Sequence, residues 1–280
     1  MKESTSIAFI GSGMMAEAMI VGLLKQKRLP ASQIIASGPR PERGRSLAKK
    51  HGISWTTDNS RAAEGRQIVV LSVKPQKMTS VLSELHGRIH PDALVLSIAA
   101  GVNITTITTG LAHRAVVRAM PNTPGQIGKG ITMWTATAEI SDEQKHQTAI
   151  ILGALGEEIF SKDEDDMDKA TALSGTGPAY IFLFMEAMID AGVHLGFSRR
   201  VAQQLVLQTM AGSVEYARQS QNHPAELRNQ VTSPGGTSAE ALYHMEKGGL
   251  RTVVSRSVWA AYQRSKALGG RRQAEIGEKS

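Results

Sequence analysis

Cysteine is absent from this chain of 280 residues, and aromatic residues make up only 4% of it. Because there are no thiols, the chain can form no disulfide framework, iron–sulfur cluster or thiolate zinc site, and it has no cysteine nucleophile. Its histidines, among them His51, His86, His113 and His194, are scattered without metal-ligand spacing. We therefore expect no bound metal and a core built mainly from aliphatic side chains.

The sequence also lacks the marks of secretion and of a membrane span. Its first residues pass from a short polar lead into a strand-like apolar run, without a long hydrophobic region or a small-residue cleavage site. The longest apolar stretch, Ala179 to Phe197, contains Glu186 and Asp190 and has helical rather than lipid-facing character. We expect a cytoplasmic protein with no membrane partner.

The net charge of +7 is compatible with nucleic acid, a membrane surface or small anionic ligands. The sequence shows no basic–aromatic cluster and no nucleic-acid motif. Small anionic ligands therefore account for the charge, and we expect no nucleic-acid partner.

Composition and length indicate a globular protein of two domains, since 41% of the residues are hydrophobic and 20% are charged. In the first half, short β-branched runs alternate with helical segments, as in a parallel sheet covered on both faces. A capping box from Ser141 to Gln144 predicts a helix that ends near Gly156. The predicted strands are Ser6–Ile10, Gln33–Ala36, Gln67–Val73, Leu94–Ala99, Ala115–Ala119, Gly130–Trp134 and Glu158–Ser161.

After about Asp163 the pattern becomes helical, with apolar residues three and four positions apart. We predict a doubly wound, mostly parallel Rossmann domain over residues 1–162 and an all-α domain over residues 163–280. Helices with such broad apolar faces often pack against a second copy of themselves, so we expect a dimerisation domain.

The segment Gly11–Ala16 has the GxGxxA pattern between a predicted strand and a predicted helix. Gly11 permits the tight turn, Gly13 lets the backbone approach a pyrophosphate, and Ala16 lets the helix pack closely on the strand. Free N–H groups at the helix start suit the phosphate. The pattern predicts a dinucleotide site rather than a merely tight turn.

The end of the second predicted strand indicates which dinucleotide binds. NAD enzymes usually have an acidic residue there, whereas this chain has Ser37, followed by Arg40 and Arg43. Arginine suits a phosphate, so the pattern favours NADPH, with NADH still possible. Taken alone, each arginine is better explained as a solvated loop residue than as a ligand contact, so the prediction rests on the missing acid as much as on the arginines.

Further strand ends and loops add candidate residues. Lys74 and Pro75 directly follow one strand, and Lys74 is either a general acid or a lysine that reaches solvent or a backbone carbonyl. Another strand ends in Ala99, Ala100 and Gly101, which leaves room for a flat group.

Two glycine-rich interruptions, 173–180 and 231–238, start helices and could either cradle a small carboxylate or simply cap those helices. The residues expected to line the substrate outside the second interruption are Met120, Asn122, Ser174 and Gly175.

Taken together, these motifs resemble pyrroline-5-carboxylate reductases over nearly the whole length. The matching stretches are GSGMMA at 11–16, VKPQ at 73–76, AAGV at 99–102, MPNTP at 120–124, SGTGPAY at 174–180 and VTSPGGTS at 231–238. The last stretch is highly specific for that family. The resemblance implies NAD(P)H-dependent reduction of 1-pyrroline-5-carboxylate to L-proline by a homo-oligomer built from interlocked dimers.

By similarity, cofactor contacts are expected from the first loop, from three strand ends and from Asn59. To these we add Arg40 from its charge. The full set is Ile10, Gly11, Ser12, Gly13, Met14, Met15, Ser37, Arg40, Asn59, Val73, Lys74, Pro75, Ala99, Ala100 and Gly101. The resemblance alone supplies Asn59.

The resemblance also implies that Ser233, Gly235, Gly236, Thr237 and Ser238 hold the substrate carboxylate and ring nitrogen. Ser238 is the residue expected to act at the ring nitrogen, and no side chain is assigned as proton donor. The family usually has Thr at position 238 and often Ser at position 176, where this chain has Thr176. Both departures keep a hydroxyl.

Two alternatives compete with the reductase. A β-hydroxyacid dehydrogenase shares the layout, but it is expected to carry a lysine after a glycine-rich helix turn, and the comparable segment Gly192–Gly196 has none. A non-catalytic NADP-binding sensor would be favoured by a degenerate carboxylate site, whereas the 231–238 stretch is intact in outline.

Overall fold

The structure is a computed structural model that describes residues 5–277, with side chains as far as residue 269. The chain divides into two compact units. We call the first the sheet unit (Met1–Gly177 with Ala261–Ser280) and the second the helical unit (Pro178–Ala260).

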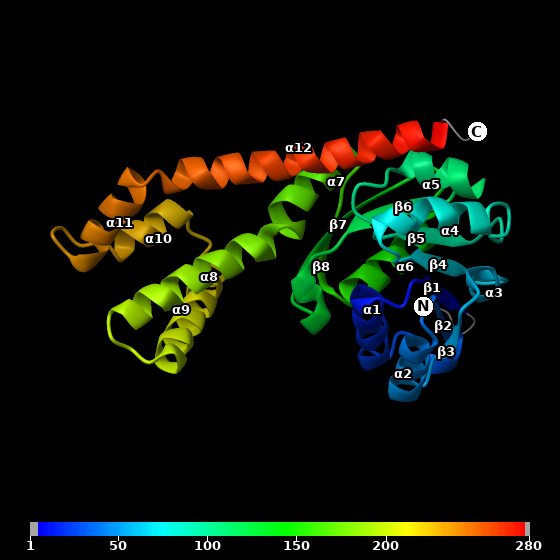
Figure 1. Ribbon diagram of the computed structural model, residues 1–280, viewed down its shortest axis with the longest axis horizontal. Helices are drawn as coiled ribbons and strands as arrows, with labels where there is room; N and C mark the ends of the chain where they lie inside the picture. Colours follow the sequence, from blue (N-terminus) through cyan, green and yellow to red (C-terminus); the bar gives the residue numbers. More distant parts are fainter. Residues whose placement is uncertain (1–4, 278–280) are drawn as a thin grey trace. The chain divides into compact units, whose positions relative to one another are not determined.

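The sheet unit contains one sheet of eight strands in the order β3-β2-β1-β4-β5-β6-β7-β8 (Figure 1). All neighbouring pairs are parallel except β6 and β7. The strands are β1 (Ile7–Ile10), β2 (Ile34–Ser37), β3 (Ser54–Thr56), β4 (Ile68–Leu71), β5 (Leu94–Ser97), β6 (Val116–Met120), β7 (Gly130–Ala136) and β8 (Gly156–Phe160). This arrangement confirms the predicted doubly wound, mostly parallel sheet.

Strand β3 was not predicted. It has three residues, and its burial pattern runs from exposed Ser54 to half-buried Trp55 and Thr56. It therefore lacks the continuous β-branched, fully buried run that identified strands such as β1 and β4, whose residues are all buried. Short edge strands carry little hydrophobic signal because only one neighbour and part of one face cover them.

Helices cover both faces of the sheet, and each face has its own hydrophobic cluster. Ile7 and Phe9 point to one face, where they pack with α1, α2 and α6. Ala8 and Ile10 point to the other, where they pack with α3, α4 and α5. This alternation is the period of two of a strand buried on both sides. The helices are α1 (Met14–Lys25), α2 (Pro41–His51), α3 (Asn59–Ala63), α4 (Met78–Leu85), α5 (Ile104–Leu111), α6 (Asp142–Gly153) and α7 (Asp165–Ala170).

The predicted capping box is present at the start of α6. The Ser141 side chain accepts a hydrogen bond from the Gln144 backbone N–H, and the Gln144 side chain accepts one from the Ser141 N–H. Short 3-10 turns also connect the elements: η1 (Ala31–Gln33), η2 (Pro75–Lys77) and η3 (Thr123–Ile127). A π-helical turn, η4 (Thr171–Gly175), follows α7.

The compact units divide at different residues from the predicted domains, because α7 and the last part of α12 pack with the sheet. Buried Arg118 on β6 forms ion pairs with Glu164 at 2.9 Å and with Asp168 at 3.3 Å. Ser265 on α12 donates a hydrogen bond to Asp168 at 2.5 Å. By compactness the first unit extends to Gly177, and the described residues from 261 onward group with it.

The remaining helices confirm the predicted all-α second half. They are α8 (Gly177–His194), α9 (Arg199–Ser220), α10 (Pro224–Gln230), α11 (Thr237–Lys247) and α12 (Leu250–Gly277). Within the helical unit, the only described side chains that are buried are those of Ala202 and Val206. Gly192 on α8 lies against Ala202 on α9, where an added Cβ would come within 2.9 Å of the alanine Cβ. The two helices therefore form a close-packed hairpin that leaves most of its apolar surface exposed.

Among the described residues, one helical stretch, Asp165–His194, is long and apolar enough to span a membrane, as judged by length and composition. A single stretch of this kind is weak evidence for a membrane span, because core helices and signal sequences pass the same test.

Candidate active site

The carboxyl ends of four neighbouring strands lie at one level of the sheet. Ile10 is in register with Ser37 on β2 and with Leu71 on β4, which is in register with Ser97 on β5. The loops that follow these strands therefore leave the sheet side by side. In doubly wound sheets, ligands bind beyond this edge.

The glycine-rich loop is tied to the strands on both sides. The Gly11 N–H donates to the Ser37 carbonyl at 3.0 Å, and the Ser72 hydroxyl donates to the Gly11 carbonyl at 2.8 Å. Gly11 has φ +105°, and a Cβ there would lie 2.8 Å from the Ser72 carbonyl and 2.9 Å from Val73 Cγ1. Only glycine fits this position, both for its backbone angle and for the close approach of the next strand.

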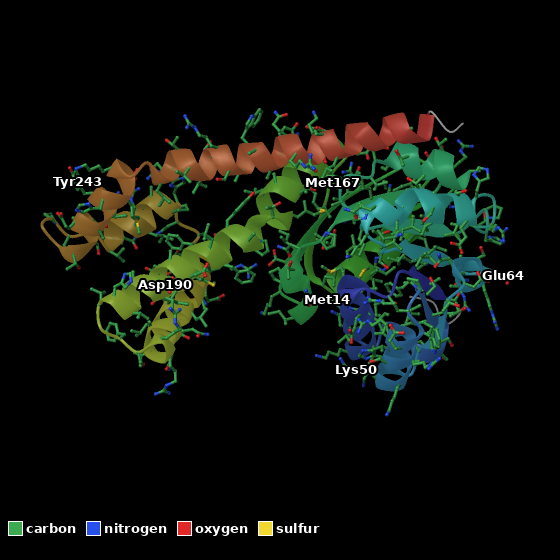
Figure 2. All side chains as sticks on the ribbon, in the orientation of Figure 1. Met14, Lys50, Glu64, Met167, Asp190 and Tyr243 are labelled. Atoms are coloured by element: carbon green, nitrogen blue, oxygen red, sulfur yellow. The ribbon has the colours of Figure 1, made fainter. Side chains whose placement is uncertain are left out.

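The amino end of α1 is left open by the same loop. Gly13 is the N-cap residue, and because it has no side chain, no side-chain cap occupies the first-turn N–H groups. Met14, at the first position of the helix, is exposed (Figure 2). Free amides together with the helix dipole suit a pyrophosphate, so this end of the sheet fits a dinucleotide.

Ser37 and Asn59 lie in one hydrogen-bonded chain at the end of β2. The buried Ser37 hydroxyl donates to Asn59 Oδ1 at 2.7 Å, and Asn59 Nδ2 donates to Glu84 Oε2 at 2.8 Å. Glu84, on α4, was not predicted. It orients the Asn59 amide, because its carboxylate can only accept a hydrogen bond and so fixes which end of the amide faces Ser37.

The two arginines after β2 differ in their surroundings. Arg40 is the exposed N-cap of α2, and the part of the chain that the structure describes shows no hydrogen bond or ion pair to its side chain. Arg43 is engaged: its Nε donates to the Ser12 carbonyl at 3.0 Å, and its Nη2 forms an ion pair with Glu17 at 2.6 Å. Arg43 is therefore held by two contacts within the protein and is not a solvated loop residue.

Glu17, in the first turn of α1, collects two further basic partners. Lys50 Nζ lies 2.9 Å and His51 Nε2 lies 3.0 Å from its Oε1 (Lys50 is labelled in Figure 2). The hydrogen bond with His51, together with those from Lys50 and Arg43, lowers the pKa of Glu17 from 4.5 to about 2 against the opposing effect of burial. This carboxylate stays ionised beside the loop, and its charge is compensated by α2.

The later strand ends are lined by small or exposed groups. Lys74 is exposed and precedes η2, which begins at Pro75. Ala99 and Gly101 are buried after β5, and Gly101 has φ +62°. These residues sit at the predicted edge, and their roles toward a cofactor stay predictions.

Four of the predicted substrate-lining residues lie together where β6 meets the π-helical turn η4. Asn122 Nδ2 donates to the Ser174 carbonyl at 3.2 Å, while Asn122 Oδ1 accepts from the Ile131 N–H at 3.0 Å. A Cβ on Gly175 would lie 2.5 Å from Met120 Cε. Asn122 therefore joins β7 to η4 and has one amide N–H left for a ligand.

The 231–238 turn belongs to the helical unit and opens α11. Gly235 has φ +68°, and a Cβ added there would meet nothing within 4 Å, while the Gly236 N–H donates to the Ser233 carbonyl at 3.1 Å. Gly236 is the N-cap without a side-chain cap, followed by Thr237 and Ser238. The turn thus presents uncapped helix amides and two hydroxyls at one helix start, an arrangement that suits a small carboxylate.

Sequence reasoning missed Glu17, Glu84 and the contacts of Arg43. Each acts through a partner 25 or more positions away along the chain. Neither a motif nor a helical period connects such positions, because the contacts exist only once α1, α2, α3 and α4 pack on the sheet.

Comparisons with known proteins agree with this geometry. Residues 164–268 match the family model described as pyrroline-5-carboxylate reductase dimerisation. Residues 6–101 match the model described as NADP oxidoreductase, coenzyme F420-dependent. The second match covers the glycine-rich loop and the strand ends that line the dinucleotide edge.

Two relatives and one solved structure are similar along nearly the whole chain. The pyrroline-5-carboxylate reductase of Pseudomonas aeruginosa is 42% identical over 94% of this chain and 96% of its own. That of Synechocystis is 38% identical, covering 95% and 99%. The crystal structure of Plasmodium falciparum pyrroline carboxylate reductase with NADP bound has a TM-score of 0.88 at 33% identity, covering 96% of this chain and all of that one (100%).

Proposed function

The chain belongs to the pyrroline-5-carboxylate reductase family, and from that premise we propose how its residues divide the reaction between them. It is an oxidoreductase of proline biosynthesis that reduces 1-pyrroline-5-carboxylate to L-proline with a nicotinamide dinucleotide. We propose that residues 1–162 bind the dinucleotide and that residues 163–280 bind the substrate and form the dimer.

The cofactor side rests on the open amino end of α1 next to the tightly held Gly11. The N–H groups that follow Gly13 would hold the pyrophosphate, and Ser37 and Asn59 would face the adenosine ribose. Ser37 is a neutral hydroxyl where NAD enzymes usually carry an acid, and Arg40 is exposed nearby. These features support a preference for NADPH over NADH.

The substrate side rests on the turn that opens α11. The backbone around Ser233, Gly235 and Gly236 would bind the substrate carboxylate, and Ser238 would accept a hydrogen bond from the protonated ring nitrogen. The reduced nicotinamide supplies the hydride that adds to the C=N carbon, while the proton already on nitrogen stays there. The chain's own contribution is to orient the imine, which is already a strong electrophile.

We propose a homo-oligomer built from interlocked dimers. The helical unit has only Ala202 and Val206 buried among its described side chains, too little to form a core of its own. Many of its large apolar residues, including Phe182, Leu195 and Trp259, are exposed. A second copy of this unit would cover them, consistent with the dimerisation model that matches residues 164–268. We place the protein in the cytoplasm, with neither a membrane nor nucleic acid as partner.

The decisive experiment follows the loss of reduced-nicotinamide absorbance with 1-pyrroline-5-carboxylate, run in parallel with NADPH and NADH. Ser238→Ala removes the proposed acceptor and should lower kcat/KM by about 10- to 100-fold, the value of one hydrogen bond to a charged group. Ser238→Thr keeps the hydroxyl and serves as the matched control, expected within a few-fold of the parent.

Turnover that is insensitive to Ser238→Ala would remove Ser238 from the site while leaving the reductase activity in place. Binding of NADPH without any turnover would contradict the reductase function and favour a sensor instead. A higher kcat/KM with NADH than with NADPH would contradict the proposed preference.

A further inference from the structure

The Arg43 side chain links α2 both to the glycine-rich loop and to α1. Lys50 and His51 of α2 also bind Glu17 on α1, but in the described part of the chain neither is hydrogen-bonded to the loop. Arg43 reaches from α2 to the glycine-rich loop, where Nε donates to the Ser12 carbonyl at 3.0 Å. Its other arm, Nη2, is held by Glu17 on α1 at 2.6 Å. The side chain is 27% exposed, which is low for an arginine on a helix surface.

The carbonyl that Arg43 binds lies in the middle of the loop that leads to the open helix end. Ser12 lies between Gly11, whose carbonyl accepts a hydrogen bond from Ser72 just after β4, and Gly13, the N-cap of α1. A Cβ on Gly38 would lie 2.5 Å from Ser12 Oγ, so the loop also presses against the end of β2. Fixing the Ser12 carbonyl toward α2 orients the peptide groups of the loop.

We propose that Arg43 is a positioning residue for the phosphate-binding loop and not the residue that selects NADPH over NADH. The proposal rests on the dinucleotide function given above and deepens it. Arg43 and Glu17 form one unit: Glu17 holds the guanidinium, and the guanidinium holds the loop carbonyl. The selection falls instead to Arg40, whose guanidinium is exposed.

This division follows from which part of the cofactor each arginine can affect. NADPH and NADH share the pyrophosphate that the loop and the start of α1 would bind, and they differ only in the 2′-phosphate of the adenosine ribose. Losing the loop contact therefore weakens the binding of both cofactors by the same factor. Losing a 2′-phosphate contact weakens the binding of NADPH alone.

The test measures dissociation constants of NADPH and NADH directly, by nucleotide fluorescence, on the full-length protein without substrate. Arg43→Met keeps the aliphatic stem and removes every donor, and it should raise both constants about tenfold while their ratio stays within about twofold. Glu17→Gln should act in the same direction on both cofactors. Combining the two changes should raise the constants by less than the product of the single effects, because both disrupt one unit.

Three further variants complete the test. Lys50→Met removes another partner of the same Glu17 carboxylate but does not touch the loop, and it should leave both constants unchanged. Arg40→Met should raise the constant for NADPH and leave that for NADH unchanged. Arg43→Lys, which keeps the charge but cannot make both contacts, should fall between the parent and Arg43→Met.

If Arg43→Met raised the dissociation constant of NADPH but not that of NADH, the proposal would be overturned. Unchanged dissociation constants for both cofactors would also overturn it. Loss of binding in Lys50→Met equal to that in Arg43→Met would also overturn it, since the effect would then come from the ion cluster as a whole. If the parent protein binds neither cofactor, the proposed function itself fails. Because that result would appear before any variant is made, the two failures are distinguishable.

Discussion

Arg118 is the buried charge whose removal has the most direct consequence for folding. Its side chain is 5% exposed, and its two carboxylate partners are 34% (Glu164) and 16% (Asp168) exposed. Arg118→Met keeps the length of the side chain and removes the charge. Two carboxylates are then left facing an apolar side chain, which is the situation in which breaking a buried ion pair is costly.

The size of the effect can be worked out from the remaining contacts. Breaking a buried ion pair costs about 3–5 kcal/mol in free energy of unfolding. Here each carboxylate keeps one hydrogen bond after the change: Glu164 accepts from the Ile104 N–H at 2.7 Å and Asp168 from the Ser265 hydroxyl at 2.5 Å. We therefore expect the lower end of that range, about 3 kcal/mol.

Urea unfolding followed by far-ultraviolet circular dichroism, at one fixed protein concentration, measures this difference. Arg114→Met is the matched control, because Arg114 is 83% exposed and pairs with Glu139 at the surface; its midpoint should equal that of the parent. Adding Glu164→Gln to Arg118→Met should recover part of the loss. A loss below about 1 kcal/mol for Arg118→Met, or one no larger than that of Arg114→Met, would refute the reasoning.

Three further predictions concern the dinucleotide edge. The pKa of Glu17 in the folded protein, about 2, lies below its ordinary value of 4.5, so the ionised carboxylate stabilises the fold fully above pH 4.5 and loses this effect as the pH falls toward 2. The difference in free energy of unfolding between the parent and Glu17→Gln, measured by urea unfolding from pH 7 to pH 3, should therefore become smaller on acidification. A difference that does not change with pH would contradict this. Gly11→Ala should abolish NADPH binding and lower the melting temperature more than Gly65→Ala. Both glycines have positive φ, but only Gly11 has atoms of Ser72 and Val73, just after β4, within 3 Å of the added Cβ. Equal shifts in melting temperature would show that the clash is not the cause. Glu84→Ala removes the acceptor that orients the Asn59 amide and should raise the KM for NADPH with kcat unchanged. Glu84→Gln can still accept the hydrogen bond, so its KM for NADPH should be closer to that of the parent. Unchanged kinetics in Glu84→Ala would show that Asn59 does not need Glu84 for its orientation.

Much of the fold was readable from local patterns. The strands β1 and β4 are continuous apolar runs whose residues are all buried. The capping box of α6 is a contact between residues three positions apart. Such features depend on neighbouring residues alone, so no tertiary information is needed to find them. Strand β3 escaped prediction because its pairing with β2 is decided by the rest of the sheet rather than by its own three residues.

The candidate site divides in the same way. The glycine-rich loop was predictable because the backbone angle and the helix start lie within a few residues of each other. The turn at 231–238 was singled out through resemblance, and its role toward the substrate stays a prediction. The contacts of Arg43 were not predictable, since sequence reasoning considered only a phosphate ligand or a solvated loop residue. The structure shows a third arrangement, a guanidinium held by Glu17 and bound to the Ser12 carbonyl.

By itself the sequence determined the class of fold, the strand-to-helix turn at Gly11 and the family of the enzyme, because each is carried by short contiguous segments. The tertiary structure alone decided how charges meet across elements. It brought Glu84 to Asn59, and it buried the side chain of Arg118, on β6, against the carboxylates at α7. Those contacts join positions 25 and 46 residues apart, and no local propensity specifies them; they form only when helices pack on the sheet and bury the groups that must then be paired.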